Sequence, residues 1–158
     1  MNCREFESTA VCTVSEILTR TDQILQRLNR LQNDTDWRGG FLCIADAFTG
    51  LPWLIFNIGE VEEDRWEKCL AYCQEKARRL AEHPNHLASA ESRDEDKGQW
   101  GGAIRADGII ISFSGLPEML DECLCLELAF YLDRLNFDDV ITITQRSGNG
   151  KFDLELIS

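Results

Sequence analysis

The sequence predicts a single α+β domain, residues 1–158, in which an antiparallel sheet of about five to six strands is flanked by helices. Segments with helical spacing of apolar residues alternate with pairs of short apolar segments typical of strands. Asp107-Gly108 marks a tight hairpin turn. A chain of 158 residues with 44% hydrophobic residues is long and apolar enough for one core. The expected order is α-β-β-α-β-β-α-β-β.

An amphipathic helix is expected to begin at Thr13, which leaves residues 1–12 as a flexible N-terminus. Thr13 and Glu16 have the spacing of a capping box, in which each side chain satisfies a free backbone N–H of the other residue. One face of this helix is apolar and packs either on the domain itself or against a second subunit. The face consists of Val14, Ile17, Leu18, Ile24, Leu25, Leu28 and Leu31.

Two strands, a helix and a polar loop are expected next. The strands are residues 41–45 and 53–58, joined by a turn over residues 46–52. The acidic run 62–64 favours a helix N-terminus, and Arg78 and Arg79 favour its C-terminal end. Residues 83–97 are polar and predict a loop.

The second half begins with two strands, residues 99–105 and 109–114, on either side of the Asp107-Gly108 turn. The stretch SGLPEMLDE, residues 114–122, then predicts a strand-to-helix turn: its glycine frees the backbone, its proline ends the strand, and its acids lie in the first helical turn. The following helix, to Leu135, is apolar almost all round and is expected to be central. Residues 136–158 are expected to form a terminal β-hairpin, because residues 140–144 alternate with period two.

Charge and cysteine content restrict the partners. The formal net charge of −12 repels phosphate backbones and anionic membranes, so neither nucleic acid nor a membrane surface is an expected partner. No secretory signal or membrane-spanning run is recognisable. The seven cysteines lie mostly in apolar segments, which predicts reduced core thiols, no disulfide, no metal and a cytoplasmic location.

Catalysis is not the expected activity. Ser114 lacks the glycine two residues before it that a nucleophile elbow requires, and no histidine is placed to act as its base. Asp121 and Glu122 are adjacent, so on a helix they point in different directions. First-turn acids also have a structural use at a helix N-terminus.

Four local motifs occur in the order found in a known family. They are Ala45-Asp46-Ala47 with Gly50, Lys76-Ala77, Gly101-Gly102 followed by Asp107-Gly108, and Ser114-Gly115 with Asp121-Glu122. In this order they resemble the small GlcG/HbpS-like domains, and the resemblance covers residues 41–135. It implies a profilin-like fold, binding of a small molecule, participation of Lys76 in the site, and assembly of subunits.

The resemblance does not readily imply that this chain binds haem. The family has more glycines in the strand before its Ser-Gly pair, whereas this chain has Ile109, Ile110, Ile111 and Phe113, which reduce the space behind the strand. Any haem ligand would have to be His83 or His86, the only histidines. Both are expected to be exposed loop residues, and the cofactor is therefore left unknown.

The candidate binding site lies at the start of the central helix, where free backbone N–H groups attract anions. Trp100, Arg105, Ser112 and Ser114 are expected near this point, with Trp100 stacking on a ligand and Arg105 pairing with a carboxylate. The alternative is that Trp100 is a packing anchor and Arg105 a solvated charge.

Two functions follow: a small-molecule-binding domain, or a non-catalytic protein–protein interaction module. A ligand-binding domain predicts a cavity with convergent polar groups, whereas an interaction module predicts an exposed apolar patch. A homodimer is also expected, from the amphipathic first helix, the exposed edge of the terminal hairpin and the assembly of the family.

Overall fold

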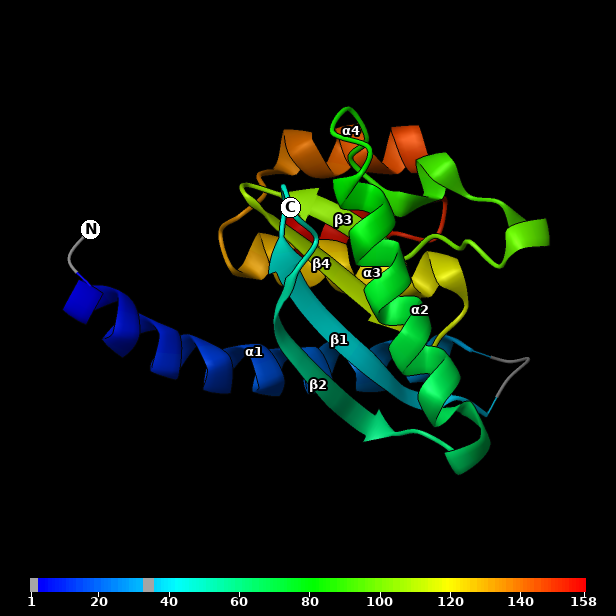
Figure 1. Ribbon diagram of the computed structural model, residues 1–158, viewed down its shortest axis with the longest axis horizontal. Helices are drawn as coiled ribbons and strands as arrows, with labels where there is room; N and C mark the ends of the chain where they lie inside the picture. The colour runs from blue at the N-terminus through cyan, green and yellow to red at the C-terminus, as the bar shows by residue number, and fades with distance from the viewer. Residues whose placement is uncertain (1–2, 33–35) are drawn as a thin grey trace.

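The computed structural model describes residues 3–32 and 36–158, with the side chains of residues 3–13 outside the description. This part of the chain contains four α-helices and four strands, whose arrangement is drawn in Figure 1. They are α1 (Cys3–Leu31), β1 (Arg38–Asp46), β2 (Pro52–Glu60), α2 (Glu63–Ala81), β3 (Ala103–Ala106), β4 (Ile109–Ser114), α3 (Glu118–Tyr131) and α4 (Phe137–Ser147). Three short 3-10 turns complete the chain: η1 (Ser89–Ser92), η2 (Glu95–Lys97) and η3 (Leu154–Ile157).

The four strands form one antiparallel sheet in the order β2-β1-β4-β3. The long hairpin β1–β2 pairs Arg38 with Glu60, and β1 joins β4 through pairs such as Phe41 with Ser114. The α+β class, the antiparallel sheet and both hairpins are therefore confirmed. The expected count of five to six strands is wrong for the described residues, because the segment after α3 is helical.

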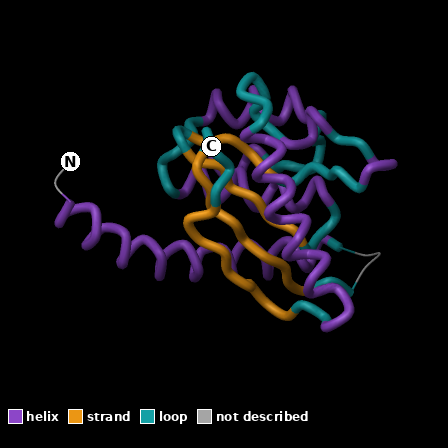
Figure 2. The backbone as a smooth tube through the Cα atoms, in the orientation of Figure 1, coloured by secondary structure: helices purple, strands orange, loops and turns teal. Residues whose placement is uncertain are grey.

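Helices cover both faces of this sheet (Figures 1 and 2). The helix α2 lies on one face, where it packs on Phe41, Cys43 and Ile110. The helices α1 and α3 lie on the other face, against Leu42 and Ile111. Successive strand residues point to opposite faces, so a strand buried on both sides is apolar throughout. This explains the continuous apolar runs of β1 and β4.

The first helix begins at Cys3, upstream of the start predicted at Thr13, so the capping-box interpretation is wrong. Residues 1–2 of the terminus expected to be flexible lie outside the description, and the backbone of residues 3–12 is helical. Ile17 and Ile24 are buried in the same core as α3, whereas Leu31 is exposed. The described part of the apolar face thus packs within its own domain.

The terminal β-hairpin expected over residues 136–158 is wrong: this segment forms α4 and the 3-10 turn η3. Asn136 caps α4, since its side chain accepts from the Asp139 N–H while Asp139 accepts from the Asn136 N–H. Val140 and Ile143, one helical turn apart, are the buried residues. The alternating pattern misled because threonine is tolerated on the exposed side of a helix as well as in a strand.

Two boundaries also differ from those expected. The strand β3 begins at Ala103 because Gly102 has φ +119, which breaks the extended backbone. The helix α3 ends at Tyr131, and Asp133, with φ +58, turns the chain. The tight turn at Asp107-Gly108 is confirmed: both residues have positive φ, as a two-residue hairpin loop requires.

The cysteines of the described core are Cys43, Cys69, Cys73, Cys123 and Cys125, and all five are buried and free. Burial raises the pKa of the Cys123 thiol to about 12, which disfavours the reactive thiolate. Among residues 3–32 and 36–158, no helix combines the length and apolar character needed to cross a bilayer.

Candidate functional site

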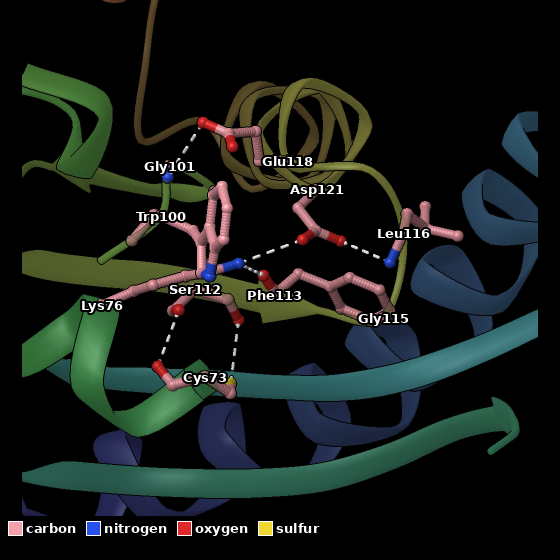
Figure 3. A network of polar contacts seen from close by, with 12 residues as sticks. Cys73, Lys76, Trp100, Gly101, Ser112, Phe113, Gly115, Leu116, Glu118 and Asp121 are labelled. Atoms are coloured by element: carbon pink, nitrogen blue, oxygen red, sulfur yellow. Dashed lines mark hydrogen bonds and ion pairs between the residues drawn. The ribbon is translucent and has the colours of Figure 1, made fainter. Parts of the chain in front are cut away.

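The stretch SGLPEMLDE is held in place by an ion pair inside the domain (Figure 3). Lys76, on α2, donates from Nζ to the Phe113 carbonyl at 2.8 Å and to Asp121 Oδ2, on α3, at 3.0 Å. The other oxygen, Asp121 Oδ1, accepts from the Leu116 N–H at 2.8 Å. Both side chains are buried. The pair therefore connects the two helical layers through the end of β4.

The surroundings of Asp121 favour its protonated form. Burial raises the pKa of Asp121 to about 7, although Lys76 and the Leu116 N–H act in the opposite direction. Removing a carboxylate from water is costly, and a single partner does not fully offset that cost. Asp121 lies in the first turn of α3, as expected, and the structure shows in addition that its side chain is buried in the core.

Gly102 makes room for this ion pair. A Cβ atom at this position would lie 2.7 Å from Lys76 Nζ and 2.8 Å from Asp121 Cβ. The backbone of Gly102 also has φ +119, a conformation that residues with a side chain rarely adopt. The Gly102 carbonyl in turn accepts from the Cys125 thiol. A glycine at position 102 is thus required by packing against α2 and α3.

The two other acids of the stretch serve different neighbours. Glu118 Oε1 accepts from Arg93 Nε at 2.6 Å and from the Gly101 N–H at 3.3 Å. Glu122 Oε2 accepts from Ser147 Oγ at 2.8 Å and from Asn149 Nδ2 at 2.7 Å. The adjacent residues Asp121 and Glu122 therefore point in different directions, as expected for a helix, and each acid ties α3 to another segment.

A cavity of about 770 Å³ opens beside this end of α3. Its polar walls come from Arg93, Glu118, Glu122, Ser147, Asn149 and Lys151, and its apolar walls from Leu31, Ala90, Pro117, Met119 and Leu120; Gly101 and Gly102 also line it. This volume is in the range of sites for small organic ligands, which combine apolar walls with a few polar groups. The stretch SGLPEMLDE is thus both a strand-to-helix turn and one wall of a cavity.

The first turn of α3 carries its own acid. The N–H groups of Leu120 and Asp121 donate to the Pro117 carbonyl, and the Glu118 carboxylate lies in the first turn. The negative charge of Glu118 offsets part of the positive potential of the helix N-terminus, which was expected to attract an anion. The cavity is therefore less suited to an anionic ligand than the sequence suggested.

Four of the five residues expected to bind a ligand lie in this region, but their polar groups mostly form hydrogen bonds to other residues of the domain. Lys76 is held by Phe113 and Asp121, and Ser112, which is buried, donates to the Cys73 carbonyl at 2.7 Å. Ser114 is buried at the end of β4. The Trp100 ring lies 5.1 Å from the Arg93 guanidinium, and the backbone carbonyl of Trp100 accepts a hydrogen bond from Arg79. The ring remains half-buried next to the cavity wall.

Arg105 lies apart from these residues and has a structural role. Its guanidinium donates to the carbonyls of Ala47, Leu80, His83 and His86 at 2.7–3.2 Å. Four bonds occupy four of the five donors of a guanidinium. The guanidinium therefore joins the β1–β2 turn, the end of α2 and the following loop, and its pairing with a ligand carboxylate stays a prediction.

The two histidines do not fit a haem ligand. The rings of His83 and His86 stack on each other, with centroids 4.7 Å apart and planes inclined by 7°, and His83 Nδ1 lies 2.7 Å from the Arg79 carbonyl. Neither residue lines the cavity at α3 or a second cavity of about 560 Å³ near Arg134. The described residues also contain no cluster of His, Cys, Asp and Glu suited to a metal ion.

Sequence reasoning missed Glu122 and Asn149 as wall residues of the cavity. Asn149 donates to Glu122 and to the Met119 carbonyl, so it fastens the segment after α4 onto α3. Gly148, with φ +71, turns the chain there. The signal available was the capping box at Asn136, which would have identified α4 and brought Asn149 to its C-terminal end.

Comparison of the chain with protein-family models, with curated proteins and with solved structures found no match. Function is therefore inferred from the residues and their geometry.

Proposed function

We propose that the protein is a small-molecule-binding domain whose ligand occupies the cavity at the N-terminal end of α3. The observation that carries this proposal is the cavity itself, about 770 Å³, lined by apolar residues of α1 and α3 and by polar groups from three separate segments. The ligand and any cofactor stay unidentified. The polar wall groups belong to ion pairs and hydrogen-bond networks within the domain, which suits binding more than catalysis.

The resemblance to GlcG/HbpS-like domains supports this proposal. Gly101-Gly102 and Glu122, from the motifs that carry the resemblance, line the cavity, and Lys76 and Asp121 lie directly behind Gly102. A four-stranded antiparallel sheet with helices on both faces agrees with a divergent profilin-like fold. We propose membership of that family on these grounds, and a cytoplasmic location stays a prediction.

Narrowing the cavity is expected to abolish binding. Met119 is 43% exposed on the cavity wall, so Met119→Trp adds volume there without filling the core. Native mass spectrometry of protein purified from its own source is expected to show a retained small mass for the wild type and none for Met119→Trp. The matched control is Leu156→Trp, because Leu156 is equally exposed, at 44%, and lies outside the cavity lining. Retention of the mass by Met119→Trp would contradict the proposal.

A second function, protein–protein interaction, is favoured by the hairpin β1–β2. Three large apolar residues of its turn and of β2 are exposed: Phe48 by 87%, Leu51 by 65% and Trp53 by 57%. The strand β2 is also the edge of the sheet, with backbone groups free to pair with another chain. In a dimer with a twofold axis, β2 of one copy pairs antiparallel with β2 of the other, so that the free backbone groups of both β2 edges are hydrogen-bonded. This surface replaces the terminal hairpin as the basis for the expected homodimer.

The dimer has a direct test. Light scattering of the wild type at micromolar concentration is expected to give twice the 18.0 kDa mass of the chain. Trp53→Lys is expected to give a single chain, because a charge on the edge strand opposes edge-to-edge pairing. Leu156→Lys serves as the control for adding a lysine at an exposed apolar position. A wild-type mass near 18 kDa would rule the dimer out.

A further inference from the structure

One oxygen of Glu122 is buried without a hydrogen-bond partner among the described residues. Glu122 is only 2% exposed, and Ser147 and Asn149 both donate to Oε2, whereas Oε1 accepts from no group in the described part of the chain. Buried carboxyl oxygens are almost always hydrogen-bonded, because an unsatisfied one loses its interaction with water without replacement. Glu122 lines the cavity, but Oε1 itself has almost no exposed surface, so a small rotation of the carboxyl group lets a ligand there supply the missing partner.

The charged groups around Glu122 indicate the sign of that partner. On α3 itself, Glu118 faces Glu122, and Glu91 of η1 adds a second negative charge. Burial raises the pKa of Glu122, and the charges of Glu118 and Glu91 add to the increase. The neighbouring Cys123 thiol stays protonated, because burial raises its pKa to about 12.

The nearby cations are mostly committed to other acids. Arg93 pairs with Glu118 at 2.6 Å, and Arg146, in the last turn of α4, pairs with Glu91 at 2.7 Å. Lys151 is exposed at the cavity wall. Among the described residues, Glu122 is thus an acid of the cavity lining without a cationic partner, a setting that favours a positively charged donor.

We propose that the cavity binds a small organic cation, a primary ammonium carried by an apolar group, with the ammonium donating to Glu122 Oε1 and the apolar group contacting Leu31, Met119 and Leu120. This assignment rests on the proposed function, because it names the chemical class of the ligand. An ammonium supplies both the missing hydrogen bond and the opposite charge. A neutral amide N–H supplies only the first, and a carboxylate supplies neither.

The test compares three probes of equal size on the full chain: butylammonium, 1-butanol and butanoate. Titrations are followed by NMR through the Asn149 side-chain amide and the Met119 and Leu120 backbone amides. Butylammonium is expected to bind at least tenfold more tightly than butanol, and butanoate least. Its affinity is expected to increase as pH rises from 5 to 8, because an ammonium binds the ionised form of Glu122. Tighter binding of butylammonium at low pH would overturn the assignment, since it would show that the ammonium does not pair with the ionised carboxylate of Glu122.

Variants separate this inference from the proposed function. Glu122→Gln is expected to weaken butylammonium binding at least tenfold and to remove its pH dependence, with butanol binding unchanged. Glu155→Gln, an exposed acid on η3, is the control and is expected to behave as the wild type. If Met119→Trp blocks butanol while butylammonium has no advantage in the wild type, the cavity is a binding site and the ammonium assignment fails. If no probe binds and purified protein retains no small mass, the proposed function fails as well.

Discussion

Gly102→Ala is expected to destabilise the protein by more than about 3 kcal/mol, because strain and steric overlap act together. The new Cβ would lie 2.7 Å from Lys76 Nζ and 2.8 Å from Asp121 Cβ, distances that real Cβ atoms do not tolerate. To relieve this overlap, either the buried ion pair has to separate or residue 102, just before β3, has to leave its φ of +119. Either change also moves the Gly101-Gly102 wall of the cavity, so binding is expected to be lost with stability.

Substitutions at two other glycines separate the cost of backbone strain from the cost of steric overlap. Gly108 has φ +82 with nothing near its Cβ position, so Gly108→Ala reports the backbone strain alone, about 1–2 kcal/mol. Gly150 has neither a positive φ of this kind nor a close neighbour, so Gly150→Ala is expected to change stability little. Urea unfolding of the three variants measures the differences. An equal cost for Gly102→Ala and Gly108→Ala would show that the ion pair does not depend on Gly102.

Lys76→Met is expected to reduce the free energy of unfolding by about 3–5 kcal/mol at pH 8, because it leaves the Asp121 carboxylate buried without its partner. It also removes the donor to the Phe113 carbonyl. Lys68→Met is the control: Lys68 lies on the same helix but is exposed, so its loss is expected to cost less than about 0.5 kcal/mol. A cost below about 1 kcal/mol for Lys76→Met would contradict the structural role of the pair.

The cost of Lys76→Met is expected to be smaller at pH 5 than at pH 8. The native pKa of Asp121 is raised to about 7, above the ordinary value of 3.8. The folded protein therefore holds a proton that the unfolded chain releases, and stability falls as pH rises through this window. Without Lys76 the pKa of Asp121 rises further, so the loss of stability extends to higher pH. Urea unfolding at both pH values measures this difference.

A double variant checks that Lys76 and Asp121 act as a unit. Combining Lys76→Met with Asp121→Asn removes the buried charge and keeps a side-chain oxygen as acceptor for the Leu116 N–H. The cost of the double variant is therefore expected to be less than the sum of the two single costs. Additive costs would show that the two side chains do not depend on each other.

The secondary structure was readable where local signals were strong. The β1–β2 pair, the Asp107-Gly108 turn and the α2 and α3 helices follow from apolar spacing and turn residues, and the structure confirms them. The helix α4 differs from the predicted hairpin because Val140–Thr144 alternates in polarity as a strand does, while the capping pair Asn136 and Asp139 favours a helix. The apolar residues of this short segment fit both the period of a strand and that of a helix, and only the capping residues distinguish the two.

The candidate site followed less from sequence. Spacing in SGLPEMLDE correctly placed a strand-to-helix junction, because glycine, proline and acids act through local backbone geometry. Which neighbour each acid meets depends on residues far away in the chain: Asp121 meets Lys76, and Glu122 meets Ser147 and Asn149. Such pairings arise from the packing of α2, α3 and α4 around the sheet. Local sequence therefore specified the class of fold and the junction, whereas long-range packing specified the buried ion pair, the burial of Glu122 and the cavity beside it.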